Sequence, residues 1–186
     1  MLTEITAEGF GVDLDIVYAT AANFTGRPVY ARPACYLLPE AAEYLRRAVA
    51  LAAPLGLRLK VFDGFRPSEA QWKLWEHTPD PEFIADPRRG SPHSMGAAVD
   101  VTLLDGVSGA ELDMGTPFDD LRPLSHHGVT EIAAEAQRNR MMLLGIMTSA
   151  GFDFFRNEWW HYQLFNARAR YPVLSDAASG AKMMTA

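Results

Sequence analysis

The sequence predicts an α+β protein, because helical and strand patterns follow one another without regular βαβ alternation. Its 186 residues suit one compact domain, and 48% of them are hydrophobic, which is enough for a sizeable core. The strand patterns are short and hairpin-like, so we expect a small, mainly antiparallel sheet flanked by helices. We expect one domain over residues 1–186 with a core at about 10–166, and a flexible end at about 172–186.

The first half of the chain carries a helix, a strand and a second helix, in that order. Residues 40–56 place apolar side chains at helical spacing and end at a proline and a glycine, which stop helices. Residues 57–62, LRLKVF, alternate apolar and basic side chains as a strand does. Pro67 suits the first turn of a helix, on which Trp72 and Trp75 share a face.

The second half contains a strand, a long helix and an aromatic segment, separated by loops. Residues 78–92 are rich in proline and lack periodicity, which predicts a long surface loop of the kind that often binds ligands. Residues 97–104 form a second strand pattern, and residues 111–128 are irregular. Residues 131–151 predict a helix capped by its final glycine, and residues 152–165 are aromatic and favour strands.

Composition excludes several classes of function. The net charge is −6 and basic residues cluster only in pairs, which argues against binding of nucleic acid through a broad basic surface. The single cysteine, Cys35, cannot form an internal disulfide and is most simply a small buried residue. The sequence shows no signal peptide and no apolar segment long enough for a bilayer, so we expect a cytoplasmic protein without membrane partners.

Two short segments bring acids and histidines close together in the sequence. His93 lies in a glycine-flanked turn, seven residues before Asp100, which interrupts an apolar strand pattern. Alternation places Asp100 and Thr102 on one face of that strand and the neighbouring valines on the other. A buried carboxylate needs a cation or hydrogen bonds. A hydrogen bond to the preceding turn would be sufficient for Asp100 taken alone.

The second segment is Glu158-Trp159-Trp160-His161. Read alone, it is a pair of core tryptophans with polar neighbours. In a regular strand the odd spacing separates Glu158 from His161, so a shared site requires a bend or bulge. Together with His93 and Asp100, however, His161 completes a ligand set suited to catalytic zinc. Glu158 is then a spare carboxylate able to take a proton from water.

At this point the sequence resembles a known family. SPHSMGAAVD fits S-x-H-x-x-G-x-A-x-D, EWWH fits E-x-W-H, and DGFRP precedes both. These segments resemble the VanX-type zinc D-alanyl-D-alanine dipeptidases. VYATAANFTGRPVY, MGTPFDD and SHH are similar to the same branch, so the likeness runs from about Val17 to His161. The metal motif alone marks the wider D,D-peptidase and hedgehog-like fold, and the other segments are specific to the dipeptidases.

The resemblance implies one zinc ion per chain, bound by His93, Asp100 and His161. It implies that Glu158 is the general base and then the proton donor to the leaving amine. It also implies that Arg66, in DGFRP, stabilises the oxyanion of the tetrahedral intermediate. Taken alone, Arg66 would be a structural ion-pair partner.

The resemblance also implies residues that bind substrate. Asp119 matches the position that holds the free ammonium of the substrate, and the choice between it and the adjacent Asp120 rests on the motif. Ser91 is expected to hydrogen-bond to substrate. His126 and His127 are rival metal ligands by residue type, but the match places them outside the ligand set.

The implied activity is hydrolysis of D-Ala-D-Ala to two D-alanines, for D-alanine salvage or for removal of the cell-wall precursor dipeptide. One alternative is a D,D-carboxypeptidase or other peptidoglycan peptidase with the same zinc site, which would need an open cleft and no ammonium site. A second is a non-catalytic, zinc-stabilised binding module, against which Glu158 and Arg66 both argue. The short connection from Arg66 to His93 leaves the substrate breadth open.

Overall fold

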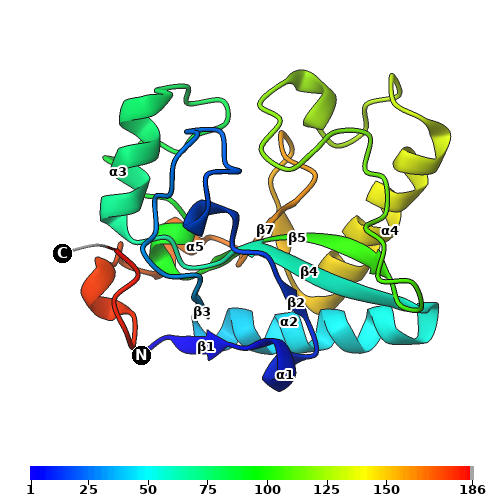
Figure 1. The fold of residues 1–186 in the computed structure, drawn as a ribbon, viewed down its shortest axis with the longest axis horizontal. Coiled ribbons are helices and arrows are strands. Elements are labelled where there is room, and N and C mark those ends of the chain that lie inside the picture. Colours follow the sequence, from blue (N-terminus) through cyan, green and yellow to red (C-terminus); the bar gives the residue numbers. More distant parts are fainter. Residues whose placement is uncertain (185–186) are drawn as a thin grey trace.

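A five-stranded sheet lies at the centre of the computed structural model, which describes residues 1–184 (Figure 1). The strand order is β2 (Asp13–Leu14), β4 (Leu57–Asp63), β5 (Ala98–Asp105), β7 (His161–Gln163) and β6 (Asp153–Phe154). The short β2 runs parallel to β4, and the other pairings are antiparallel. A separate antiparallel pair joins β1 (Thr3–Ile5) to β3 (Cys35–Leu37). The predicted α+β class with a mainly antiparallel sheet is confirmed.

Two helices cover one face of the sheet, and a third helix lies with the long loops on the opposite side. The helices are α1 (Ala7–Phe10), α2 (Pro39–Ala52), α3 (Ser68–His77), α4 (Ala134–Ala150) and α5 (Ala167–Arg170). Helices α2 and α4 pack against each other, α2 contacts β4, and α4 contacts β5. In Figure 1 the sheet separates α2, below it, from α3 and two long loops above it. No helix within residues 1–184 is both long enough and apolar enough to cross a bilayer.

The central strands divide their side chains between these two faces. Val61 pairs with Val101 and Leu59 with Leu103, and all four are fully buried in the hydrophobic core. Asp100 therefore points to the opposite face, as alternation along the strand predicts. The core sits between the sheet and α2 with α4, and the polar face lies under the loops.

The predicted elements agree with the structure to within a few residues. The helix predicted at 40–56 is α2 followed by a 3₁₀ turn, and Gly56 ends it in the left-handed conformation (φ 71°). The long helix starts at Ala134, three residues later than predicted, and Gly151 caps it in the left-handed region. Residues 78–92 contain no helix or strand, as predicted.

Residues 176–184 pack against the rest of the protein, which differs from the flexible end that the sequence predicted. The Asp176 carboxylate accepts a hydrogen bond from the Met183 amide at 2.7 Å, and Met183 is fully buried. The Ala31 amide in turn donates to the Met183 carbonyl at 2.7 Å. This packing was not predicted because the segment consists mostly of small residues without a periodic pattern, and its contacts are with residues far away in the sequence. Residues 185–186 of the predicted tail lie outside the described residues.

Candidate active site

A cavity of ≈ 210 Å³ lies on the loop-covered face of the sheet. Residues 81–86 and 89–93 line one side of it, and residues 119 and 121 line another. Its floor comes from the sheet and from the turn before β7, through Asp100, Glu158 and His161. The surface loop predicted at 78–92 therefore forms much of the wall of a binding site.

The register of the sheet places three site residues in one row. Asp100 of β5 lies opposite Asp63 of β4 on one side and opposite His161 of β7 on the other. Residues directly opposite one another in antiparallel strands present their side chains on the same face, with Cβ atoms about 5 Å apart. An irregularity in β4 between Val61 and Asp63 brings Asp63 into this row.

His93 reaches the row from a 3₁₀ turn, His93–Met95, that precedes β5. Gly96 ends this turn at φ 69°, in the left-handed region that glycine adopts without strain. A Cβ atom there would also lie 2.7 Å from a methyl group of Leu2. The chain can therefore turn sharply after His93 and enter β5. This turn places both His93 and Asp100 at the same end of the strand.

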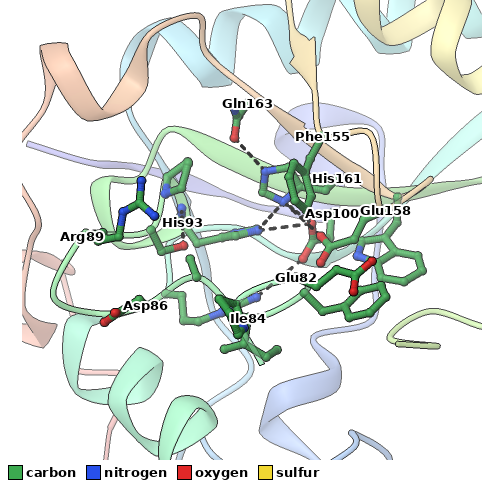
Figure 2. Close-up of a pocket in the computed structure, with 18 of the residues that line it drawn as sticks. Glu82, Ile84, Asp86, Arg89, His93, Asp100, Phe155, Glu158, His161 and Gln163 are labelled. Atoms are coloured by element: carbon green, nitrogen blue, oxygen red, sulfur yellow. Dashed lines mark hydrogen bonds and ion pairs between the residues drawn. The ribbon is translucent and has the colours of Figure 1, made fainter. Parts of the chain in front are cut away.

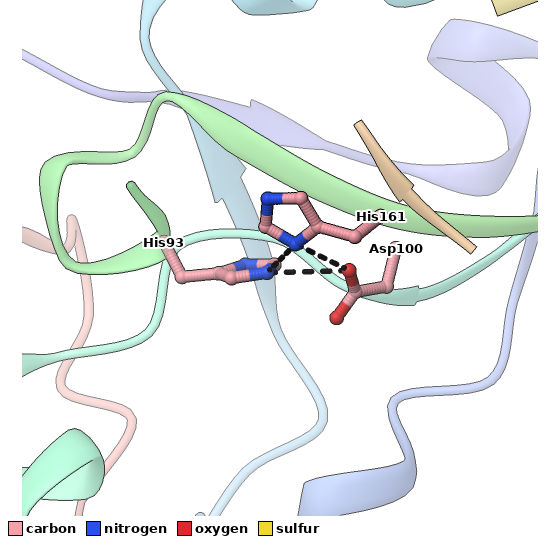
Figure 3. A group of neighbouring side chains, drawn as sticks. All are labelled: His93, Asp100 and His161. Carbon is pink, nitrogen blue, oxygen red and sulfur yellow. Dashed lines mark hydrogen bonds and ion pairs between the residues drawn. The ribbon is translucent and has the colours of Figure 1, made fainter. Parts of the chain in front are cut away.

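His93, Asp100 and His161 converge on one point (Figure 3). His93 Nε2 lies 3.0 Å from His161 Nδ1, and each of these nitrogens lies 3.2 Å from Asp100 Oδ1. All three side chains are buried.

Hydrogen bonds on the outer side of each imidazole fix its tautomer. His93 Nδ1 donates to the Gly64 carbonyl at 2.8 Å, and His161 Nε2 donates to Gln163 Oε1 at 3.0 Å. The inward nitrogen of each ring therefore carries a lone pair rather than a proton. Gly64 can approach because it lacks a side chain: a Cβ atom would lie 2.8 Å from Cys35 Sγ.

The convergent atoms fit a divalent metal ion. Three acceptors face one another, and Asp100 Oδ1 has no hydrogen-bond partner among the residues that the structure describes. Tetrahedral zinc with ligands at about 2.0–2.1 Å places neighbouring ligand atoms about 3.3–3.4 Å apart. The observed separations of 3.0–3.2 Å are close to this value. Two imidazole nitrogens and one carboxylate oxygen are also ligand types that zinc takes.

Glu158 lies beside the three ligand atoms but apart from them. Its Oε2 is 3.8 Å from His161 Nδ1, and it lines the same cavity. The chain between Phe155 and His161 turns: the Glu158 amide donates to Phe155 O, and the His161 amide donates to Glu158 O. This turn provides the bend that the spacing of Glu158 and His161 requires. Burial, and then the charges of Asp100 and Asp119, raise the pKa of Glu158 well above its ordinary value.

The two tryptophans between Glu158 and His161 fix this turn. Each is 1% exposed, and their rings meet edge to face at 5.3 Å. Trp159 Nε1 donates to Thr116 Oγ1 at 2.9 Å, while Trp160 lines the cavity. Trp159 is therefore core, and Trp160 is both core and pocket wall.

Arg66 is both an ion-pair partner and a pocket residue. Its Nε donates to Asp63 Oδ2 at 2.9 Å and its Nη1 to Gln71 Oε1 at 3.0 Å. Its Nη2 lies 3.7 Å from Asp100 Oδ2, and its guanidinium carbon lies 4.8 Å from the centre of the Tyr18 ring. Four groups thus hold one cation rigidly at the edge of the ligand cluster. Arg66 is an ion-pair partner, as its position taken alone suggests, and its role at an oxyanion stays a prediction.

Asp119 and Ser91 also face the cavity. Asp119 has a φ of 60° and accepts a hydrogen bond from the Tyr18 hydroxyl at 2.9 Å. Burial, and then the negative charge of Asp100, raise the pKa of Asp119 to about 7. Asp120, by contrast, forms an ion pair with Arg122. Ser91 is buried, and its hydroxyl accepts the His93 amide hydrogen at 3.3 Å.

The remaining candidate histidines lie outside the ligand cluster. His126 Nε2 is 3.6 Å from a Glu82 carboxylate oxygen at the pocket edge. His127 packs against Phe154, with ring centres 5.0 Å apart. Burial, and then the positive charge of Arg140, lower the pKa of His127 to about 4.

Sequence reasoning missed several residues that support the site. Gln163 follows His161 by two positions on a strand, and this period places both on one face. Asp63 precedes Arg66 by three positions, but its burial was not evident from the turn-forming Asp-Gly pair. Tyr18 contacts Asp119 across 101 positions, so no local pattern points to it.

A family profile and the sequences of curated relatives agree on one family. The sequence profile of the peptidase M15 family, described as D-ala-D-ala dipeptidase, matches residues 2–178. A D-alanyl-D-alanine dipeptidase of Escherichia coli K12 is 40% identical over 90% of this chain and 86% of its own length. Proteins of the same name from Enterococcus faecium and Streptomyces coelicolor are 34% and 33% identical, each over 83% of this chain and 86% of the relative. A solved LD-carboxypeptidase aligns at 19% identity and a TM-score of 0.47, over 72% of this chain and 61% of that one.

Proposed function

Because the chain belongs to the D-Ala-D-Ala dipeptidase family of metallopeptidases, we propose that it hydrolyses D-alanyl-D-alanine to two D-alanines with one zinc ion per chain. We propose that the whole chain acts as one metallopeptidase domain in the cytoplasm. The observation that carries the proposal is the buried triangle of His93, Asp100 and His161 ligand atoms, with a carboxylate and a guanidinium in the same cavity. A non-catalytic zinc module would need neither Glu158 nor Arg66 at this position.

In this proposal Glu158 moves the proton. His93, Asp100 and His161 would hold the zinc ion, which would supply a Lewis acid to polarise the peptide carbonyl and to lower the pKa of a water molecule. Glu158 takes a proton from the attacking water as the C–O bond forms, and gives it to the amide nitrogen as the C–N bond breaks. The burial that raises its pKa makes Glu158 a stronger base than an exposed glutamate. The products are two free amino acids, with no covalent enzyme intermediate.

Arg66 has the position and the rigidity for stabilising the oxyanion. Its guanidinium points along the cavity wall between Asp63, Gln71 and the ligand Asp100. Donors held in place before the reaction stabilise developing negative charge without reorganising, and removal of one such donor typically costs about 10²- to 10³-fold in rate. The rigid contacts of Arg66 with Asp63 and Gln71 meet this requirement.

Asp119 is proposed to bind the ammonium of the substrate, and Ser91 to hydrogen-bond to its backbone. Burial, and then the negative charge of Asp100, raise the pKa of Asp119 and so disfavour its ionisation, and a cation beside it would therefore be stabilising. This requirement for an ammonium separates a dipeptidase from a D,D-carboxypeptidase, whose substrate continues on the N-terminal side of the scissile bond.

The test combines metal analysis with D-alanine release from D-Ala-D-Ala, before and after chelation and again after zinc is restored. We expect one zinc per chain and activity that follows the metal. N-acetyl-D-Ala-D-Ala, which lacks the ammonium, should be hydrolysed poorly, and Asp119→Asn should reduce the preference for the free dipeptide. Equal rates on both substrates would favour the carboxypeptidase alternative. No release from either would refute the proposed activity.

A further inference from the structure

The cavity carries opposite charges at its two ends. All four of the charged residues Arg89, Arg168, Asp119 and Glu158 line it. Arg168 bonds to the carbonyl of Gly90, the residue after Arg89, and Asp119 lies close enough to Glu158 for its charge to act on that carboxyl. Figure 2 shows Arg89 and Glu158 on opposite sides of the metal-ligand cluster, with His93 reaching in from the side of Arg89. The acidic end and the ligand cluster have roles in the proposed reaction, whereas the two arginines do not.

Both arginines line the cavity while remaining exposed to solvent, and most of their side-chain donors have no partner among residues 1–184. Arg168 of α5 donates one hydrogen bond, from Nε to the Gly90 carbonyl at 3.0 Å, which anchors it against the wall. Neither Arg168 nor Arg89 has a carboxylate within ion-pair distance among residues 1–184. Burial, and then the positive charge of Arg89, lower the pKa of Arg168, so the two cations lie close enough to repel each other.

The nearest acid does not neutralise this pair. Asp86 also lines the cavity, but both of its oxygens are taken by the guanidinium of Arg88, at 2.7–3.1 Å. Arg89 contributes its amide, not its guanidinium, to this turn, through a 2.9 Å bond to the Asp86 carbonyl. Two guanidinium groups that repel each other at a cavity wall, without an acidic partner, favour binding of an anion.

We propose that Arg89 and Arg168 bind the C-terminal carboxylate of the dipeptide. This inference rests on the proposed function. A dipeptide zwitterion has an ammonium, one peptide bond and a carboxylate in that order. Figure 2 shows the cavity in the same order, from the acid Glu158 through the metal-ligand cluster to Arg89. Guanidinium groups pair with carboxylates through parallel N–H donors, so this end also selects against a neutral terminus.

The arginine pair would thereby define the length of the substrate on its C-terminal side. A peptide that continues beyond the second residue replaces the carboxylate with an amide, which leaves both guanidinium groups without a partner. The acidic end imposes the matching limit on the N-terminal side through Asp119. Together the two ends restrict the site to free dipeptides.

The test compares D-Ala-D-Ala with D-Ala-D-Ala amide in the wild type, in Arg89→Gln and in Arg168→Gln. In the wild type, kcat/KM for the acid should exceed that for the amide by about 10- to 100-fold, the range for hydrogen bonds between charged groups. Each single variant should lose about tenfold on the acid, mainly through KM, and little on the amide. Arg89→Lys should recover part of the loss, because it retains the charge.

Arg170→Gln is the matched control. Arg170 belongs to the same short helix as Arg168, but it pairs with Glu40 at 2.6 Å and does not line the cavity. This variant should hydrolyse both substrates as the wild type does. A loss equal to that of Arg168→Gln would show an effect of net charge or of helix stability, and would overturn the assignment.

Two outcomes separate this inference from the proposed function. A wild-type enzyme that hydrolyses the acid and the amide equally well retains its function, but has no carboxylate site. A wild-type enzyme inactive on both fails the proposed function, and binding then decides the inference. Titration of D-Ala-D-Ala and its amide into the zinc-loaded protein by calorimetry should show tighter binding of the acid, and Arg89→Gln should abolish the difference. Equal affinities would refute the arginine site.

Discussion

Gln163 should control metal affinity without touching the metal. Its side-chain oxygen accepts the Nε2 hydrogen of His161 at 3.0 Å, which leaves Nδ1 free to face Asp100. Gln163→Leu removes this acceptor and retains similar bulk. The imidazole can then take the other tautomer, which turns a proton toward the site.

The expected loss of zinc affinity follows from the hydrogen bond that is removed, which lies on the outer side of a metal-binding histidine. Partners on the outer side of metal-binding histidines typically contribute about 10- to 100-fold in metal affinity or activity. That range corresponds to about 1.4–2.7 kcal/mol. Gln163 is half-buried, so water can replace part of the lost bond. We therefore expect a loss toward the lower end, about 10- to 30-fold in zinc Kd.

Competition with a chromogenic chelator measures zinc Kd directly and needs no turnover. Gln137→Leu is the control. The Gln137 side-chain amide donates to the backbone carbonyls of Thr130 and Ile132, which precede α4, and Gln137 does not line the cavity. Gln163→Glu should bind zinc at least as tightly as the wild type, since a carboxylate is a stronger acceptor. A folded Gln163→Leu variant with wild-type Kd would refute the reasoning.

Three further predictions concern the base, the half-buried His127 and the buried Arg140. Glu158→Gln should lower kcat by about 10²- to 10⁴-fold while one zinc per chain remains, and loss of the metal would instead make Glu158 a ligand. The pKa of His127 falls from its ordinary 6.5 to about 4 on folding, so the unfolded chain takes up the proton first. The free energy of unfolding should decrease as the pH falls from about 6.5 to 4, by at most ~3 kcal/mol. Urea unfolding at several pH values should show that His127→Phe lacks this decrease. A pH profile of the variant identical to that of the wild type would contradict the prediction. Arg140 donates to three backbone carbonyls of loop 114–126, so Arg140→Met should cost about 2–4 kcal/mol in the same urea assay, and a cost below 1 kcal/mol would mean that water replaces these bonds.

The sequence was sufficient for the elements that have a strong period or a local stop signal. Strand alternation placed Asp100 on the polar face of β5, and Gly151 marked the end of α4. The bend before His161 was also expected, because a shared site for Glu158 and His161 requires it. The motif order predicted His93, Asp100 and His161 as metal ligands, and the structure brings these three side chains together; that they bind a metal stays a prediction.

Contacts between distant segments could not be predicted in the same way. The hydrogen bond of Tyr18 to Asp119 depends on how two loops cross, and neither loop has a period that reports on the other. The burial of Met183 depends on the carboxylate of Asp176, which is indistinguishable in sequence from a solvated acid. Arg89 and Arg168 lie 79 positions apart, and only the folded cavity brings them to one end.

The row of Asp63, Asp100 and His161 also has a consequence for how the chain folds. These residues meet only when β4, β5 and β7 pair in the native register, and a slip of one residue would turn Asp100 to the opposite face. A metal ion held by His93, Asp100 and His161 would therefore bind tightly only to correctly paired strands, and it would stabilise them over slipped ones by mass action. At a free metal concentration of 100 times Kd this amounts to about 2.7 kcal/mol. Metal supplied during refolding should thus favour the native strand register over slipped ones. It should increase the yield of native protein and slow the unfolding of the central strands.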